Sequence, residues 1–219
     1  MNGVYRCEGA PLLNPYALTI LGSGAPSEQI ELIASKLEVK VSTWKVIPQV
    51  KYHFVTTTVV EWQYIFTTIP CFEIIIESLK HCIKNKGLHL HGYVIMPNHA
   101  HYILSTDEGK NLSDVMRDFG TYTSRHLTDL LEQESRFDIL ESFQSAAKAD
   151  GRGNEYKVWQ DGFHPIALDS ENFFTQKLNY LHENPVRKGY VDRPEQWRYS
   201  SARNYVLDDD SIIVIEKLL

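Results

Sequence analysis

The order of apolar patterns along the chain predicts an α+β fold, in which an antiparallel sheet carries helices on one face and a C-terminal helical tail follows. Segments with the composition of strands alternate with segments whose apolar residues recur at helical spacing. The two central strand segments are separated only by Pro97-Asn98, a turn signal that predicts a hairpin. With 43% hydrophobic and 23% charged residues among 219, the chain is expected to bury one main core.

The first elements follow from composition and spacing. Tyr52–Val60 is rich in Thr, Val and aromatic residues, as strands are. Phe72–Lys86 places its apolar residues at helical spacing, and Gly87 is expected to end that helix. Leu88–Met96 and Ala100–Leu104 are the two predicted strands of the hairpin.

A second helix is predicted after the hairpin. Asn111 or Ser113 can cap a helix that runs to about Glu134, and a broad apolar stripe supports it. A polar stretch, Ala146–Asn154, comes next.

One more strand and helix complete the sheet domain. A short strand is predicted near Tyr156–Trp159 or Pro165–Leu168. A helix at Glu171–His182 is expected to end before Pro185, because the residue ahead of proline disfavours helical geometry. The resulting order, β-α-β-β-α-β, is that of the ferredoxin-like or split βαβ arrangement.

We expect the chain to have three parts. Residues 1–46 are weakly patterned apart from a helix-like piece at Ser27–Leu37, and they predict an N-terminal arm or added element. Residues 47–206 form the main domain, and residues 207–219 form a C-terminal tail.

Charge and cysteine usage exclude several classes of protein. The 22 Lys+Arg and 28 Asp+Glu give a net charge of -6, which argues against coating nucleic acid through bulk charge. Cys7, Cys71 and Cys82 are an odd number without metal-like spacing, unlike the cysteines of a disulfide-stapled secreted domain. No apolar run approaches the length of a membrane helix. A cytoplasmic protein without a membrane partner is therefore expected.

A His-x-His pair is the first candidate for chemistry. Strand alternation puts His99 and His101 on one face, and neutral imidazole is a good ligand of divalent transition metals. An isolated pair is weak evidence in a chain with nine histidines. His89 and His91 have the same spacing one strand earlier, and we interpret them as the solvent face of the hairpin.

The predicted helix after the hairpin carries a second candidate group. Tyr122 and His126 are four residues apart and share a helical face, so a tyrosine and a candidate third ligand lie on one surface. Alternatively, Tyr122 belongs to the core stripe with its hydroxyl at the rim. Gly120 costs a helix about 1 kcal/mol relative to Ala, which indicates that another group approaches this turn closely.

Six motifs in order carry a resemblance to a known family. They are Tyr52-His53-Phe54-Val55-Thr56, Tyr93-Val94-Ile95-Met96-Pro97-Asn98-His99-Ala100-His101, Phe119-Gly120-Thr121-Tyr122-Thr123-Ser124, Trp159-Gln160-Asp161-Gly162-Phe163-His164, Tyr180-Leu181-His182-Glu183-Asn184-Pro185-Val186 and Tyr199-Ser200-Ser201-Ala202. From about Tyr52 to Tyr205 the chain resembles the single-tyrosine HUH transposases, and among them the REP-associated tyrosine transposases.

The resemblance implies a ferredoxin-like domain in which His99 and His101 hold a divalent metal, Mg²⁺ or Mn²⁺. Tyr122 would attack a phosphodiester of single-stranded or hairpin DNA, giving a 5′-phosphotyrosine and a free 3′-hydroxyl, so that cleavage can become strand transfer without ATP. The protein would act as a monomer or a homodimer, and in a dimer the tyrosine helix could serve the partner's histidines.

The third metal ligand departs from the family pattern. The family often carries a carboxamide one helical turn beyond the tyrosine, and the matching position here is His126. Three imidazoles suit Mn²⁺, Co²⁺ or Zn²⁺ better than Mg²⁺, which prefers oxygen.

A basic segment near the C-terminus supplies candidate DNA contacts. Aromatic residues interleave with its cations, as single-strand binding needs, although the same aromatics could pack on the sheet. The candidate DNA-binding residues are Lys177, Arg187, Lys188, Arg198 and Arg203.

Two other functions use the same residues. The chain could be a domesticated module that binds a DNA hairpin without cutting it, which the acidic balance favours. It could also be a metal-dependent phosphodiesterase that uses water as the nucleophile at the same histidines.

Overall fold

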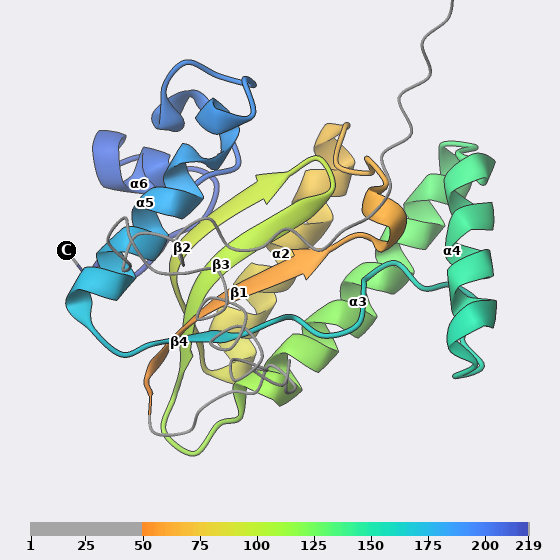
Figure 1. Ribbon diagram of the computed structural model, residues 1–219, viewed down its shortest axis with the longest axis horizontal. Coiled ribbons are helices and arrows are strands. Elements are labelled where there is room, and N and C mark those ends of the chain that lie inside the picture. Colours follow the sequence, from red (N-terminus) through yellow and green to blue (C-terminus); the bar gives the residue numbers. More distant parts are fainter. Residues whose placement is uncertain (1–49, 219) are drawn as a thin grey trace, which may run out of the picture. The chain divides into compact units, whose positions relative to one another are not determined.

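Four antiparallel strands form the sheet on which the helices pack (Figure 1). The computed structural model describes residues 50–218, so the predicted arm and its helix at Ser27–Leu37 lie outside the described residues. The strand order is β2-β3-β1-β4, which confirms the predicted split βαβ arrangement. The strands are β1 (Tyr52–Thr58), β2 (Leu88–Met96), β3 (His99–Thr106) and β4 (Ile166–Leu168).

Local signals explain where the first helices begin and end. The α2 helix ends at Gly87, whose φ of 69° is the left-handed conformation that glycine adopts without strain. The Asn111 side chain caps α3 by accepting a hydrogen bond from the Ser113 backbone N–H. The helices are α2 (Ile69–Lys86), α3 (Leu112–Gln133), α4 (Phe137–Asp150), α5 (Glu171–Arg187) and α6 (Ala202–Leu207), with single 3₁₀ turns η2 (Val60–Trp62) and η3 (Pro194–Gln196).

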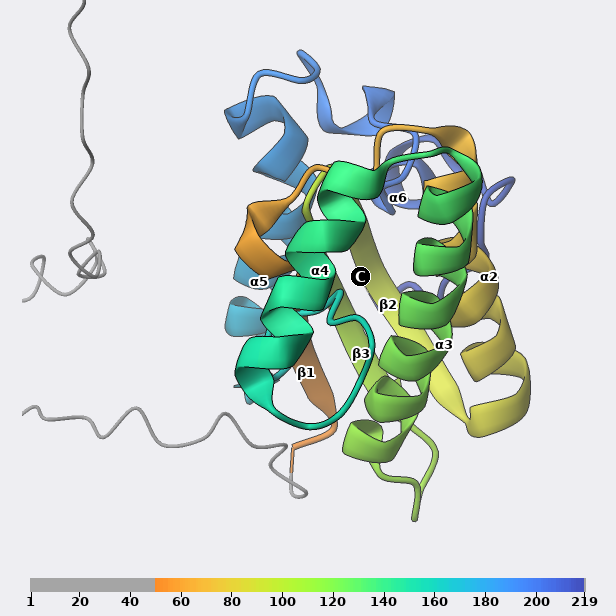
Figure 2. The same cartoon turned by 90° about the vertical axis from the view of Figure 1, so that its right-hand side faces the viewer.

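Helices cover both faces of the sheet, whereas one covered face was predicted (Figure 2). On the first face, α2 and α3 pack on residues such as Val55 and Tyr102. On the second face, α5 packs on Phe54 and Ile103 through Leu178 and its neighbours. We call these the α3 face and the α5 face. The burial of β3 agrees with this arrangement. Every residue from His99 to Ser105 is buried, as expected of a strand that is covered on both sides.

The region between α3 and α5 differs most from the prediction. The whole of α4 was missed, although Ile139, Leu140, Phe143 and Ala147 are buried at helical spacing, because no side chain caps its start. Of the two predicted strand positions, Ile166–Leu168 forms β4, while Trp159 makes only an isolated bridge with Val59.

The predicted end of α5 before Pro185 is wrong. The helix continues to Arg187 with Pro185 inside its last turn. A proline so near the end removes one backbone donor and leaves only two helical residues beyond it.

The C-terminal residues pack on the sheet domain. Ile213 and Ile215 are buried in the main core, and the Glu216 backbone N–H donates to the Leu90 carbonyl at 2.8 Å. Within residues 50–218, no helix is long and apolar enough to span a membrane.

Candidate active site

His99 and His101 lie side by side on β3, on the α5 face of the sheet. Their ring centroids are 4.9 Å apart, and the His101 ring stacks on Phe54 at 5.1 Å. Both side chains are almost fully buried. Strand alternation therefore brings the predicted pair together, as the sequence indicated.

A short hydrogen-bond chain sets the tautomer of His99. The Asn98 amide nitrogen donates to the Trp62 carbonyl at 3.2 Å, so the amide oxygen of Asn98 faces His99. That oxygen lies 2.7 Å from His99 Nδ1, which must donate because a carboxamide oxygen only accepts. In the neutral ring, Nε2 then keeps its lone pair.

His101 also has an oxygen beside Nδ1, here a hydroxyl that can either accept from Nδ1–H or donate to the Nδ1 lone pair. Its Nδ1 lies 2.8 Å from the Thr56 hydroxyl oxygen, across the β1–β3 pair. Burial lowers the pKa of His101 to about 3, and burial, with a smaller effect of Lys188, lowers the pKa of His99 to about 4. Both rings are therefore neutral at physiological pH, as metal ligation requires.

Tyr180 on α5 is the tyrosine that the structure brings to this pair. Its ring centroid lies 5.5 Å from that of His101, and the side chain is 38% exposed. Two cations flank the ring: Lys177 Nζ is 5.7 Å from its centroid, and the Arg187 guanidinium carbon is 5.4 Å away. Tyr180 belongs to a motif that carried the resemblance, but no role for it follows from the sequence pattern.

Tyr122 lies on the other side of the sheet. Phe119, one turn earlier on α3, packs against Tyr102, whose side chain points away from the His101 side. Tyr122 itself is 48% exposed and lines a cavity of about 180 Å³ between α3 and α2, beside Ser78, Cys82 and Lys86. The structure therefore does not bring Tyr122 to His99 and His101 within one chain.

His126 lies beside Tyr122 and away from the histidine pair. Its ring centroid is 4.1 Å from that of Tyr122, on the α3 face. No cluster of three or more His, Cys, Asp or Glu side chains suited to a metal occurs among residues 50–218. Asn184, one helical turn beyond Tyr180 on α5, is buried and can offer a carboxamide oxygen on the same side of the helix.

The predicted DNA-binding cations divide into two groups. Lys177 and Arg187 flank Tyr180, and Lys188 lies near enough to His99 to affect its pKa. Arg203, in contrast, binds the Asp209 carboxylate at 2.5 Å and the Glu195 carbonyl at 3.1 Å, so its guanidinium holds the chain end together. The exposed Arg198 lies over the Tyr199 ring.

Most aromatic residues of this segment pack on the protein. Of the two roles that the sequence allowed, base stacking and packing on the sheet, the second therefore applies to them. Trp197 donates to the Ile95 carbonyl at 2.9 Å, and Tyr199 stacks on Phe72 at 4.0 Å. Tyr190 differs, because it is 43% exposed.

The other predicted histidine pair is not a solvent face. His91 is 1% exposed and lies 2.8 Å from the Ser105 hydroxyl, while His89 lies between the Glu216 and Asp107 carboxylates. The C-terminal segment around Glu216 contacts both histidines, and the alternation of residues along the strand gives no sign of this contact.

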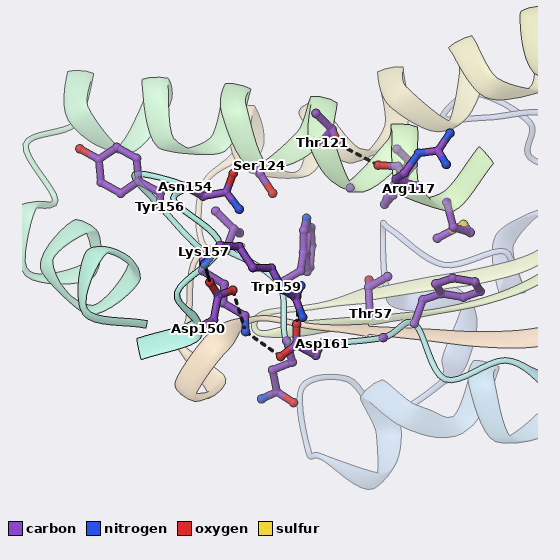
Figure 3. A pocket seen from close by; sticks show the side chains of 18 residues that line it. Thr57, Arg117, Thr121, Ser124, Asp150, Asn154, Tyr156, Lys157, Trp159 and Asp161 are labelled. Carbon is purple, nitrogen blue, oxygen red and sulfur yellow. Dashed lines mark hydrogen bonds and ion pairs between the residues drawn. The ribbon is translucent and has the colours of Figure 1, made fainter. Parts of the chain in front are cut away.

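Residues Trp159 to Phe163 of the fourth motif line a cavity of about 470 Å³ on the α3 face (Figure 3). Two backbone hydrogen bonds hold this segment along β1: the Gln160 N–H donates to the Thr58 carbonyl at 2.8 Å, and the Phe163 carbonyl accepts from the Thr56 N–H at 3.0 Å. The cations that line this cavity have carboxylate partners, in the pairs Arg117–Asp114, Arg152–Asp161 and Lys157–Asp150. The cations around Tyr180, in contrast, have no ion-pair partner within residues 50–218.

Comparison with known proteins agrees with the fold and identifies the family. A family model described as "Transposase IS200 like" matches residues 46–183. The chain belongs to the IS200-like transposase family. Its matched region contains the histidine pair and Tyr180, and this confirms the family-level resemblance drawn from the six motifs.

Solved structures similar to this IS200-like transposase include a REP-associated tyrosine transposase bound to a REP hairpin. The TM-score is 0.54 at 17% identity, covering 82% of this chain and 94% of that chain. A putative transposase from Deinococcus radiodurans has a TM-score of 0.38 at 16% identity, covering 65% of this chain and 95% of the other. At such identities the first likeness supports the shared fold. No curated protein matches the chain.

Proposed function

We propose that the protein nicks single-stranded or hairpin DNA and transfers the strand, with Tyr180 as the nucleophile. The observation that carries this proposal is the position of Tyr180, whose ring lies 5.5 Å from His101 on the same face of the sheet. Tyr122 was the nucleophile expected from the sequence, and its position across the sheet from both histidines favours Tyr180 instead.

The residues present suit a divalent metal such as Mn²⁺ or Mg²⁺. His99 and His101 are neutral, and with each Nδ1–H donated to the neighbouring Asn98 or Thr56 oxygen, Nε2 of each ring is the ligand atom. Asn184 could add an oxygen ligand, which both metals accept more readily than a third imidazole. A bound metal would neutralise charge on the non-bridging oxygens of the phosphate.

The chain's own groups account for the cleavage step. The Tyr180 hydroxyl oxygen attacks phosphorus, and the bond from phosphorus to the 3′ oxygen breaks. The phenolic proton passes through solvent to the leaving 3′ oxygen, which becomes a hydroxyl, and attack of a DNA 3′-hydroxyl on the phosphotyrosine reverses the step and transfers the strand. Lys177, Arg187 and Lys188 offer cationic contacts to neighbouring phosphates, and none of the three has an ion-pair partner among the described residues.

Hairpin DNA is the proposed substrate. The REP-associated tyrosine transposase of similar fold is described as bound to a REP hairpin. We propose that residues 47–206 bind and cut such DNA in the cytoplasm, as a monomer or a homodimer, and that residues 1–46 are an added arm.

The test is a covalent DNA attachment assay with two matched tyrosine variants. Full-length protein is incubated with labelled hairpin oligonucleotides and Mn²⁺ or Mg²⁺, then resolved on denaturing gels. We expect a protein–DNA band that Tyr180→Phe abolishes, that EDTA abolishes, and that Tyr122→Phe retains. Each variant removes one hydroxyl from an exposed ring, so the pair differs mainly in the face of the sheet.

Other outcomes point to the alternatives. A band lost in Tyr122→Phe and kept in Tyr180→Phe would return the nucleophile to α3, acting on a partner's histidines in a dimer. DNA binding without any band would favour the non-cutting module. Metal-dependent cleavage that survives both variants would favour water as the nucleophile.

A further inference from the structure

An exposed tryptophan stands next to the histidine pair. Trp62, in the η2 turn, is 55% exposed, and its ring centroid lies 5.9 Å from that of His99. Its carbonyl accepts the hydrogen bond from Asn98 that orients His99. No step of the proposed transfer uses the indole.

The backbone that presents Trp62 is strained. Glu61 and Trp62 have φ angles of 53° and 56°, in the left-handed region that residues with a Cβ seldom adopt. Two such residues in succession are unfavourable, and they persist only where neighbouring contacts hold them.

Contacts from other elements hold this turn on both sides. Within α4, the Ser142 hydroxyl donates to the Glu61 carboxylate at 2.6 Å. Arg136, at the start of α4, donates to the Tyr64 carbonyl at 2.7 Å. Asn98 holds Trp62 from the hairpin turn. The fold thus fixes an apolar ring in solvent beside a candidate phosphate site.

The surroundings suit single-stranded nucleic acid. Tyr64 and Tyr190 are neighbouring exposed rings, at 55% and 43%. Lys188 supplies a positive charge near His99. Aromatic faces combined with cations bind unpaired bases and their phosphates, and such stacking tolerates any base.

We propose that Trp62 is a stacking platform for an unpaired base of the DNA next to the phosphodiester held at His99 and His101. The inference rests on the proposed function, since it takes the histidine pair as the phosphate site. A paired base has both faces covered by its neighbours, so the platform selects single-stranded over duplex DNA at the cleavage position.

The experiment measures binding of a dT 12-mer and of a fully abasic 12-mer to full-length protein in EDTA, where no cleavage occurs. We expect wild-type protein to prefer the dT 12-mer, and Trp62→Ala to bind it roughly 5- to 150-fold more weakly. Binding of the abasic strand should be unchanged in Trp62→Ala. Trp62→Phe keeps an aromatic face and should recover most of the affinity.

Phe137→Ala is the matched control, because it removes a ring that is 58% exposed from the start of α4. Equal dT affinity in wild type and Trp62→Ala would overturn the platform, as would equal losses in Trp62→Ala and Phe137→Ala. Wild-type protein that does not prefer the dT 12-mer would overturn it too. The attachment assay tests the nicking proposal separately. Trp62-dependent binding of the dT 12-mer without any covalent band would refute the nicking chemistry and leave the stacking platform standing.

Discussion

The two faces of the sheet differ in how much apolar core they bury and in which reactive side chains remain accessible. On the α3 face, helices α2 and α3 bury an apolar core, and Tyr122 lies outside it. On the α5 face, one helix covers a smaller core and leaves the histidine pair beside Tyr180. The cations near Tyr180 have no described carboxylate partner, whereas those lining the cavity on the α3 face do.

This difference shows how a sheet separates stability from reactivity. A strand presents alternate residues to its two sides, so neighbours such as His101 and Tyr102 enter different environments. The core can be concentrated on one side, and polar groups can then be buried on the other side with fixed partners. Variants that act on one face alone test this separation.

The largest expected effect is acid destabilisation of the α5 face. Four histidines on this side have pKa values below the ordinary 6.5, mainly because of desolvation: the buried His91, His99 and His101, and the partly buried His182. Unfolding raises each pKa, so the unfolded chain takes up protons first as pH falls. The free energy of unfolding should drop between pH 7 and 5 by about 2 kcal/mol for each imidazole whose pKa is near 4.

Urea titrations at several pH values measure this effect. His182→Gln removes one such imidazole and should reduce the slope by up to about 1.4 kcal/mol per pH unit between pH 6 and 5, above the range in which carboxylates titrate. His89 acts in the opposite sense, because Glu216 and Asp107 raise its pKa and its stabilising effect is present at low pH. A wild-type stability that is flat over this range would contradict the effect of burial.

A smaller effect is expected from two adjacent threonines on opposite faces. Thr56→Val removes the hydroxyl beside His101 Nδ1 and frees the ring to change tautomer. Loss of such a partner typically costs 10- to 100-fold in metal affinity or activity. We expect a drop of about this size in Mn²⁺ affinity, measured by titration calorimetry, and in the covalent attachment assay.

Thr57→Val is the control for this pair. The Thr57 hydroxyl is buried on the α3 face, where its polar neighbour is the buried Tyr102 hydroxyl. Its replacement should leave Mn²⁺ affinity within about twofold. It also leaves the buried Tyr102 hydroxyl without its polar neighbour, which should lower the free energy of unfolding by about 1–3 kcal/mol. Equal losses in the two variants would break the distinction between the faces.

Much of the fold could be predicted from sequence because its signals are local. The hairpin turn, the Asn111 cap and the Gly87 helix end each depend on a few adjacent residues. The faces covered by the helices could not be predicted, since both sides of the buried strands are apolar. The start of α4 lacks a capping side chain, and the strained turn at Trp62 depends on contacts from distant elements.

The site shows the same limit. Tyr122 with His126 and Tyr180 with Asn184 have the same spacing of four residues on a helix. Spacing identifies residues that share a helical face, but it does not identify the side of the sheet on which that helix packs. The histidine pair was predictable because both members lie on one strand. Tyr180, in contrast, is 81 residues after His99 in the sequence and lies on a separate helix.

The smallest expected effect comes from Gly120, inside α3. A Cβ at this position would lie 3.9 Å from Trp159 Cδ1, an ordinary van der Waals contact, and the backbone is helical. Gly120→Ala should therefore raise the free energy of unfolding by about 0.5–1 kcal/mol, because alanine loses less backbone entropy in a helix. Thermal and urea unfolding measure the gain. Since Gly120 lies on the α3 face, covalent attachment should not change. Lower attachment with the gain in stability would show that the α3 face takes part in DNA cleavage.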